Sequence, residues 1–141
     1  MTAMTSKYRI LETNVLLERF VTYNEVFSEY LKTIKIIERG EALRYETYGR
    51  LIDNYIRNIK QFIQLCNSYL AKYKLENSLV AEKLNDYFLD LIGAISCMDP
   101  ESETVDHGSL ELAQSRIKER QTEFVNSINF FIKIRIDLCF D

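Results

Sequence analysis

One row of apolar residues in the middle of the chain constrains the fold more than any other feature of the sequence. Its members follow one another at steps of four and three within residues 41–73: Tyr48, Ile52, Tyr55, Ile59, Phe62, Cys66, Tyr69 and Tyr73. In an α-helix this spacing forms one apolar stripe, and the opposite face of the segment is polar. The spacing therefore predicts a long amphipathic helix that packs against other helices along its whole length.

The segment before this row has the same spacing and predicts another long helix. It is expected to start between Ser6 and Glu12 and to end at Gly40, since glycine suits the left-handed position that closes a helix. The short connection that follows favours an antiparallel helix hairpin. One continuous helix over residues 7–73 is the alternative, because a glycine inside a helix costs only ~1 kcal/mol.

A third, shorter helix follows the central one. Asn77 and Ser78 are its candidate N-caps, and its apolar row runs to about Met98. The pair Asp99-Pro100 ends it, because the residue before a proline is disfavoured in the α region.

A fourth helix is expected after an acidic, polar loop at residues 99–108, with Ser109 as its N-cap. Its row is interrupted by polar residues: Gln114, Gln121 and Arg135. Residues 132–140 alternate between apolar and polar types, which is typical of a strand. A strand has no evident partner in this chain, so a continuation of the helix is favoured there.

These elements predict an all-α protein, an antiparallel up-down-up-down four-helix bundle with heptad-like packing. The 141 residues fit a single helical-bundle domain over residues 1–141. Four glycines and one proline leave few turn signals for a fold of many strands.

The net charge of −3 is unevenly distributed along the chain. Residues 32–74 carry +5 and residues 76–108 carry −7. We interpret this asymmetry as pairing within the molecule, with a charged surface for a partner as the alternative.

The three cysteines, Cys66, Cys97 and Cys139, lie far apart and show no CxxC spacing, which favours reduced thiols. No signal-peptide core and no run of ~18 apolar residues is present, so we expect a cytoplasmic protein that does not span a membrane.

Catalytic and metal-binding patterns are missing from the sequence. His107 is the only histidine, whereas a di-iron helical bundle needs Glu-x-x-His on two helices. Three loop acids have calcium-loop spacing: Asp99, Glu101 and Glu103. Thr104 and Leu110 stand where such a loop needs glycine and glutamate. We expect no enzyme activity, no cofactor and no metal site.

A charged face of the central helix is the best candidate for binding an anionic partner. Its residues are Arg44, Arg50, Arg57 and Lys60. Asp53 lies between two of them and the sequence pI is about 5.3, which disfavours nucleic acid as the partner.

Nine tyrosines and no tryptophan are an unusual composition. Seven of the tyrosines lie on the predicted packing rows: Tyr23, Tyr30, Tyr48, Tyr55, Tyr69, Tyr73 and Tyr87. We interpret them as core residues with hydrogen-bonded hydroxyls, with a partner interface as the alternative.

The end of the chain has too many apolar residues for one helix face. The candidate interface consists of Phe131, Ile134, Ile136, Leu138 and Phe140. We therefore predict a non-enzymatic protein–protein interaction module, such as an adaptor, assembly or regulatory subunit, that forms a homodimer, binds a protein partner, or both. Alternatives are a nucleic-acid-associated accessory protein that uses the basic face, and a small-ligand sensor with a pocket between helices.

Overall fold

The computed structural model describes residues 2–37, 45–102 and 104–140, with side chains described for residues 10–37, 48–102 and 104–130. Within these ranges the chain forms four α-helices and one two-stranded sheet. The elements in chain order are α1 (Thr2–Ile37), α2 (Tyr45–Lys72), α3 (Leu79–Gly93), the 3₁₀ turn η2 (Ala94–Cys97), β1 (Met98–Asp99), β2 (Thr104–Val105) and α4 (His107–Phe140). The predicted all-α class is confirmed.

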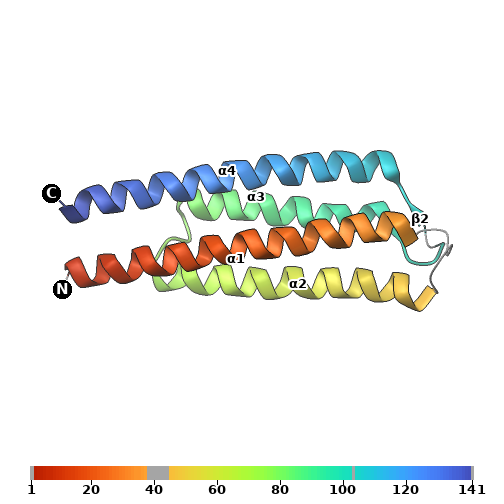
Figure 1. The fold of residues 1–141 in the computed structure, drawn as a ribbon, viewed down its shortest axis with the longest axis horizontal. Helices are drawn as coiled ribbons and strands as arrows, with labels where there is room; N and C mark the ends of the chain where they lie inside the picture. Colours follow the sequence, from red (N-terminus) through yellow and green to blue (C-terminus); the bar gives the residue numbers. More distant parts are fainter. Residues whose placement is uncertain (1, 38–44, 103, 141) are drawn as a thin grey trace.

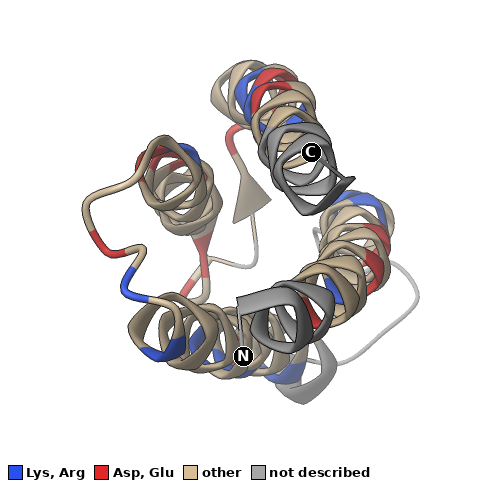
Figure 2. Ribbon diagram, turned by 90° about the vertical axis from the view of Figure 1, so that its left-hand side faces the viewer, with Lys and Arg blue, Asp and Glu red and all other residues tan. Residues whose placement is uncertain are grey.

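Consecutive helices lie side by side and reverse direction, so that both ends of the chain lie at the same end of the molecule (Figure 1). Helix α1 contacts α2 and α4, and α3 also contacts both α2 and α4. Viewed along the helices, the four surround a common centre (Figure 2). Because α1 and α2 lie alongside each other, the alternative of one continuous helix over residues 7–73 is wrong.

The predicted apolar rows form the core. All eight members of the row in α2 are buried, including Tyr73 just after the helix. The row of α3 is also buried, as are four apolar members of the α4 row: Leu110, Ile117, Phe124 and Ile128. Rings from different helices meet at the centre, where Phe20 contacts Phe62, Tyr87 and Phe124 with centroids 4.3–5.9 Å apart.

Buried tyrosine hydroxyls connect the elements to one another. Three of them donate hydrogen bonds of 2.7 Å: Tyr48 to the Thr104 carbonyl in β2, Tyr55 to the Leu91 carbonyl in α3, and Tyr87 to Asn24 Oδ1 in α1. Burial raises the pKa of Tyr55 and Tyr87, so these hydroxyls stay protonated donors at neutral pH. The interpretation as core residues with hydrogen-bonded hydroxyls is therefore confirmed for Tyr48, Tyr55 and Tyr87, whereas Tyr23 and Tyr30 are half-buried.

Two helix ends in the first half of the chain bear on the sequence predictions. Helix α1 starts at Thr2, earlier than expected, because residues 2–12 contain no glycine or proline that would stop it. Its expected end at Gly40 lies outside the described residues. The N-cap of α3 is Ser78, one of the two predicted candidates, and its side chain accepts from the Ala81 N–H.

The segment between α3 and α4 is more ordered than the predicted loop. Helix α3 ends at Gly93, before the predicted Met98, because η2 follows and Met98 then pairs with Val105 in the antiparallel sheet. Helix α4 starts at His107, so Ser109 is not its N-cap. Asp106 has that role, and its carboxylate accepts the Ser109 N–H at 3.2 Å and the Ser109 hydroxyl at 2.8 Å.

The tail of the chain is helical. Helix α4 continues without a break to Phe140, so the alternative of a strand over residues 132–140 is wrong.

Candidate functional site

Ion pairs between helices show where the helices end relative to one another. Lys72, the last residue of α2, donates to Glu12 Oε1 at 2.5 Å. Next to this pair, the hydroxyls of Tyr69 and Thr13 are hydrogen-bonded to each other. The end of α2 is therefore level with Glu12 of α1. Since the two helices run in opposite directions, residues 2–11 of α1 lie beyond the end of α2 (Figure 1).

Ion pairs also show the relative level of α3 and α4. Arg120 Nε lies 3.0 Å from Asp90 Oδ2, and Lys83 Nζ lies 3.8 Å from Glu123 Oε2. Leu79, the first residue of α3, comes four residues before Lys83. It is therefore level with about residue 128 of α4. Residues 129–140 therefore lie beyond the start of α3.

We call residues 2–11 and 129–140 together the projecting end, and residues 12–128 the body. At a rise of ~1.5 Å per residue, the two segments extend about 15 Å and about 18 Å past their neighbours. Figure 1 shows both segments at the end of the molecule where the chain starts and finishes. In the body each helix has two neighbouring helices. In the projecting end α1 and α4 continue without α2 and α3 beside them.

Helical register divides the predicted interface residues between two sides of α4. Steps of three and four from Arg120, which pairs with α3, lead through Ser127 to three of them: Phe131, Ile134 and Leu138. Ile136 and Phe140 do not lie on this row. The side chains of all five lie outside the described residues. The residues at these register positions of the tail are apolar in the sequence, at a level where α3 is no longer present.

Two described side chains mark the step where α3 begins. Leu79 is the first residue of α3 and is 53% exposed, and Phe130 of α4 is 62% exposed. By the register of the ion pairs they lie at nearly the same level along the molecule. Apolar surface is therefore exposed on both sides of this step.

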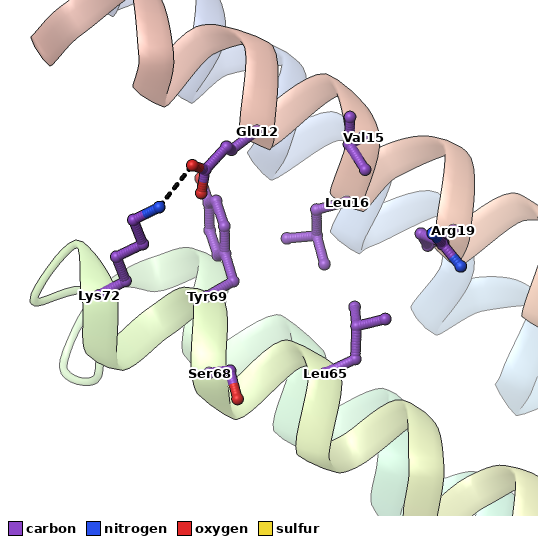
Figure 3. Close-up of a pocket in the computed structure, with 8 residues that line it drawn as sticks. All are labelled: Glu12, Val15, Leu16, Arg19, Leu65, Ser68, Tyr69 and Lys72. Carbon is purple, nitrogen blue, oxygen red and sulfur yellow. Dashed lines mark hydrogen bonds and ion pairs between the residues drawn. The ribbon is translucent and has the colours of Figure 1, made fainter.

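A groove between α1 and α2 adjoins the projecting end (Figure 3). It has a volume of about 350 Å³ and is lined by Glu12, Val15, Leu16, Arg19, Leu65, Ser68, Tyr69 and Lys72. Leu16 and Leu65 point into the space between the helices, and the pair of Glu12 and Lys72 closes one end. Hydrogen bonding from Lys72, and then from Tyr73, lowers the pKa of Glu12.

Three of the four residues of the predicted basic face have described side chains. Arg50, Arg57 and Lys60 are exposed on one side of α2 and make no ion pair with a described side chain, while Arg44 lies outside the described residues. Among the described side chains, no ion pair joins the basic segment 32–74 to the acidic segment 76–108. Asp90 of the acidic segment pairs instead with Arg120 of α4.

Asp99, one of the three loop acids, holds the turn that follows it. The Asp99 carboxylate accepts the Ser102 hydroxyl at 2.8 Å and the Glu101 N–H at 3.0 Å, and these hydrogen bonds, the first above all, lower its pKa. Over the described residues, no three His, Cys, Asp or Glu side chains gather as they would around a metal ion. His107 is exposed at the start of α4.

Sequence reasoning missed the groove and the buried polar partners of the tyrosines. Val15 lies beside the core row of α1 at 49% exposure, and only the position of α2 makes it part of a groove. Asn24 and Thr13 gave no signal because a single polar residue on a packing row is not distinguishable from a solvated one.

Comparison of the chain with protein-family models, with curated proteins and with solved structures gave no match. In the described residues, no helical segment combines the length and the hydropathy of a membrane span.

Proposed function

We propose that this protein is a non-enzymatic protein–protein interaction module that associates with itself through the projecting end. In this proposal residues 1–141 form one domain, an antiparallel up-down-up-down four-helix bundle with heptad-like packing. The observation that supports it most is that α1 and α4 continue past their neighbours. The end of α2 is level with Glu12 of α1, and the start of α3 is level with about residue 128 of α4.

The apolar content of the tail supports an interface at this end. Phe131, Ile134 and Leu138 continue the side of α4 that α3 covers in the body. Burying one such side chain contributes ~1.5–3 kcal/mol, so leaving three uncovered forgoes several kcal/mol. Proteins rarely expose a contiguous apolar patch larger than a few hundred Å², and a closed two-fold dimer is the commonest way of covering one.

A cytoplasmic location is part of the proposal. Cys66 and Cys97 are free and buried, and burial raises the pKa of both thiols. Unreactive, unpaired thiols are compatible with a reducing compartment.

Light scattering coupled to gel filtration tests the proposal. The chain should elute at twice 16.7 kDa at tens of micromolar. The double variant Ile134→Glu with Leu138→Glu should elute as a monomer, because it places charges on the apolar side of the tail, and should keep the helical circular dichroism of the body. Lys118→Glu, on an exposed position of the same helix, is the matched control and should remain a dimer. A wild-type monomer would refute self-association.

Two other functions each have one supporting observation. The groove of about 350 Å³ between α1 and α2 is at the small end of the range for ligand sites, which supports a small-ligand sensor. Exposure of Arg50, Arg57 and Lys60 supports association with nucleic acid. Thermal shifts across a metabolite panel test the first, and salt-dependent retention on a polyanion resin tests the second.

A further inference from the structure

We propose that the groove between α1 and α2 binds a small organic anion that carries one carboxylate on a short apolar chain. The carboxylate pairs with Arg19 at one end of the groove, and the chain covers the apolar residues in its middle. This inference rests on the small-ligand function proposed for the groove and names its ligand class. It does not depend on self-association, because residues 129–140 do not line the groove.

The charges along the groove leave one cation without an ion pair. Three of the lining residues are charged, and two of these, Glu12 and Lys72, pair with each other at 2.5 Å. The third, Arg19, is exposed and makes no ion pair with a described side chain. The lining therefore has a net charge of +1, and this charge is located at Arg19.

The sequence of α2 beside the groove adds to this positive charge. Residues 54–75 contain four cations and no acid: Arg57, Lys60, Lys72 and Lys74. Glu12 is the one acid among the described lining residues, and Lys72 already neutralises it. An anion beside Arg19 is therefore attracted by both helices. A carboxylate fits best, because the planar guanidinium group can donate two parallel hydrogen bonds to its oxygens.

The middle of the groove is apolar. Val15 is 49% exposed, Leu16 is buried, and Leu65 of α2 is half-buried. Figure 3 shows Leu16 and Leu65 pointing into the space between the helices, with Arg19 toward one end and the pair of Glu12 and Lys72 at the other. An apolar chain lying over Val15 and Leu65 removes their surface from water, which favours binding.

The dimensions of the groove limit the length of the chain. Arg19 and Glu12 are seven residues apart on α1, which is about 10 Å at ~1.5 Å per residue. The pair of Glu12 and Lys72 closes the far end, so a chain longer than this meets charged groups. The volume of about 350 Å³ is also near the lower limit for ligand pockets. The groove is therefore suited to a short chain.

Nuclear magnetic resonance of the valine and leucine methyl groups of the full chain tests the site, with octanoate as the probe. Octanoate should shift the resonances of Val15, Leu16 and Leu65 in a saturable way at millimolar concentration. Acetate lacks the chain and octylamine carries the opposite charge, so each should bind at least about tenfold more weakly. Octylamine binding as tightly as octanoate would overturn the role of charge. Shifts of equal size at Leu112, outside the groove, would overturn the site.

A charge variant tests the contact with the carboxylate. Arg19→Gln removes the cation from an exposed position, so it should weaken octanoate binding about tenfold and leave the circular dichroism melt unchanged. Arg50→Gln is the matched control, since Arg50 is an exposed cation of α2 that does not line the groove, and its variant should bind with wild-type affinity. Equal affinities of wild type and Arg19→Gln would overturn the proposed contact.

A metabolite panel, observed through the same methyl groups, separates the ligand class from the small-ligand function. If octanoate leaves Val15 and Leu65 unchanged while another compound shifts them, the carboxylate assignment is wrong and the small-ligand function stands. If no compound shifts them, both are wrong. Light scattering of the same samples reports self-association separately, and a monomer that binds octanoate would overturn self-association alone.

Discussion

The body and the projecting end use the same helical periodicity with different numbers of neighbours. In the body the row of α2, from Tyr48 to Tyr73, is covered by the other helices, and all eight of its members are buried. In the projecting end the row of α4 continues at the same spacing, but α2 and α3 have ended. A regular apolar row therefore predicts that a helix face is covered, and does not indicate which chain covers it.

The largest effect is expected from a charge in the core of the body. Ile59 is 3% exposed in the middle of α2, so Ile59→Asp would bury an unpaired carboxylate and should unfold the protein. Arg57→Asp, two residues away on the exposed face, should change the free energy of unfolding by no more than ~0.5 kcal/mol. Thermal melts followed by circular dichroism measure both, and similar losses would mean that the faces of α2 are wrongly assigned.

A smaller effect is expected from removing one hydroxyl that connects the helices of the body. Tyr87→Phe deletes the 2.7 Å hydrogen bond to Asn24 and leaves the amide oxygen without that donor, which should cost ~1–2 kcal/mol of unfolding free energy. Tyr30→Phe is the control, since its half-buried hydroxyl accepts only a 3.4 Å bond from Asn58. Urea denaturation measures the two losses, and an equal loss would contradict the role given to Tyr87.

The smallest effect is expected at the border between the two regions. The pKa of Glu12 lies below its usual value of 4.5, chiefly because Lys72 donates to it, so its ionised form is stabilised by folding. This contribution is present above pH 4.5 and should be lost as the pH falls through the lowered pKa. Both side chains are more than a third exposed, so the contribution is ~0.5 kcal/mol or less.

Glu12→Gln and Lys72→Met should each remove this pH-dependent part of the free energy of unfolding, and to the same extent. Urea denaturation at pH 3–6 measures it. If either variant leaves the pH profile unchanged, the ion pair of Glu12 and Lys72 contributes nothing to the free energy of unfolding.

The sequence was sufficient to predict most of the body because its apolar rows are long and regular. The rows of α2 and α3, and the N-cap Ser78, could be identified from spacing and capping chemistry alone. The start of α1 and the N-cap of α4 could not be identified in this way, since several residues of equal capping propensity lie near the start of each helix. Asp106 is the cap because its carboxylate reaches Ser109, which only the backbone position decides.

The candidate site was less accessible from the sequence. The surplus of apolar residues in the tail was evident, but the projecting end depends on where α2 and α3 stop relative to α1 and α4. The pairs of Lys72 with Glu12 and of Arg120 with Asp90 mark those levels, and their residues lie 60 and 30 positions apart in the sequence. Periodicity carries no information on contacts at such separations, so the groove beside Val15 was also missed.

Hydrogen exchange of the backbone amides, measured below and above the dimerisation concentration, tests the central claim most directly. The claim is that α4 beyond residue 128 lacks cover until a second copy supplies it. We predict that amides of residues 129–140 exchange quickly in the dilute protein and become protected in the concentrated protein, while those of α2 and α3 are equally protected in both. Equal exchange of residues 129–140 at both concentrations, in a sample that light scattering shows to be dimeric when concentrated, would contradict the account.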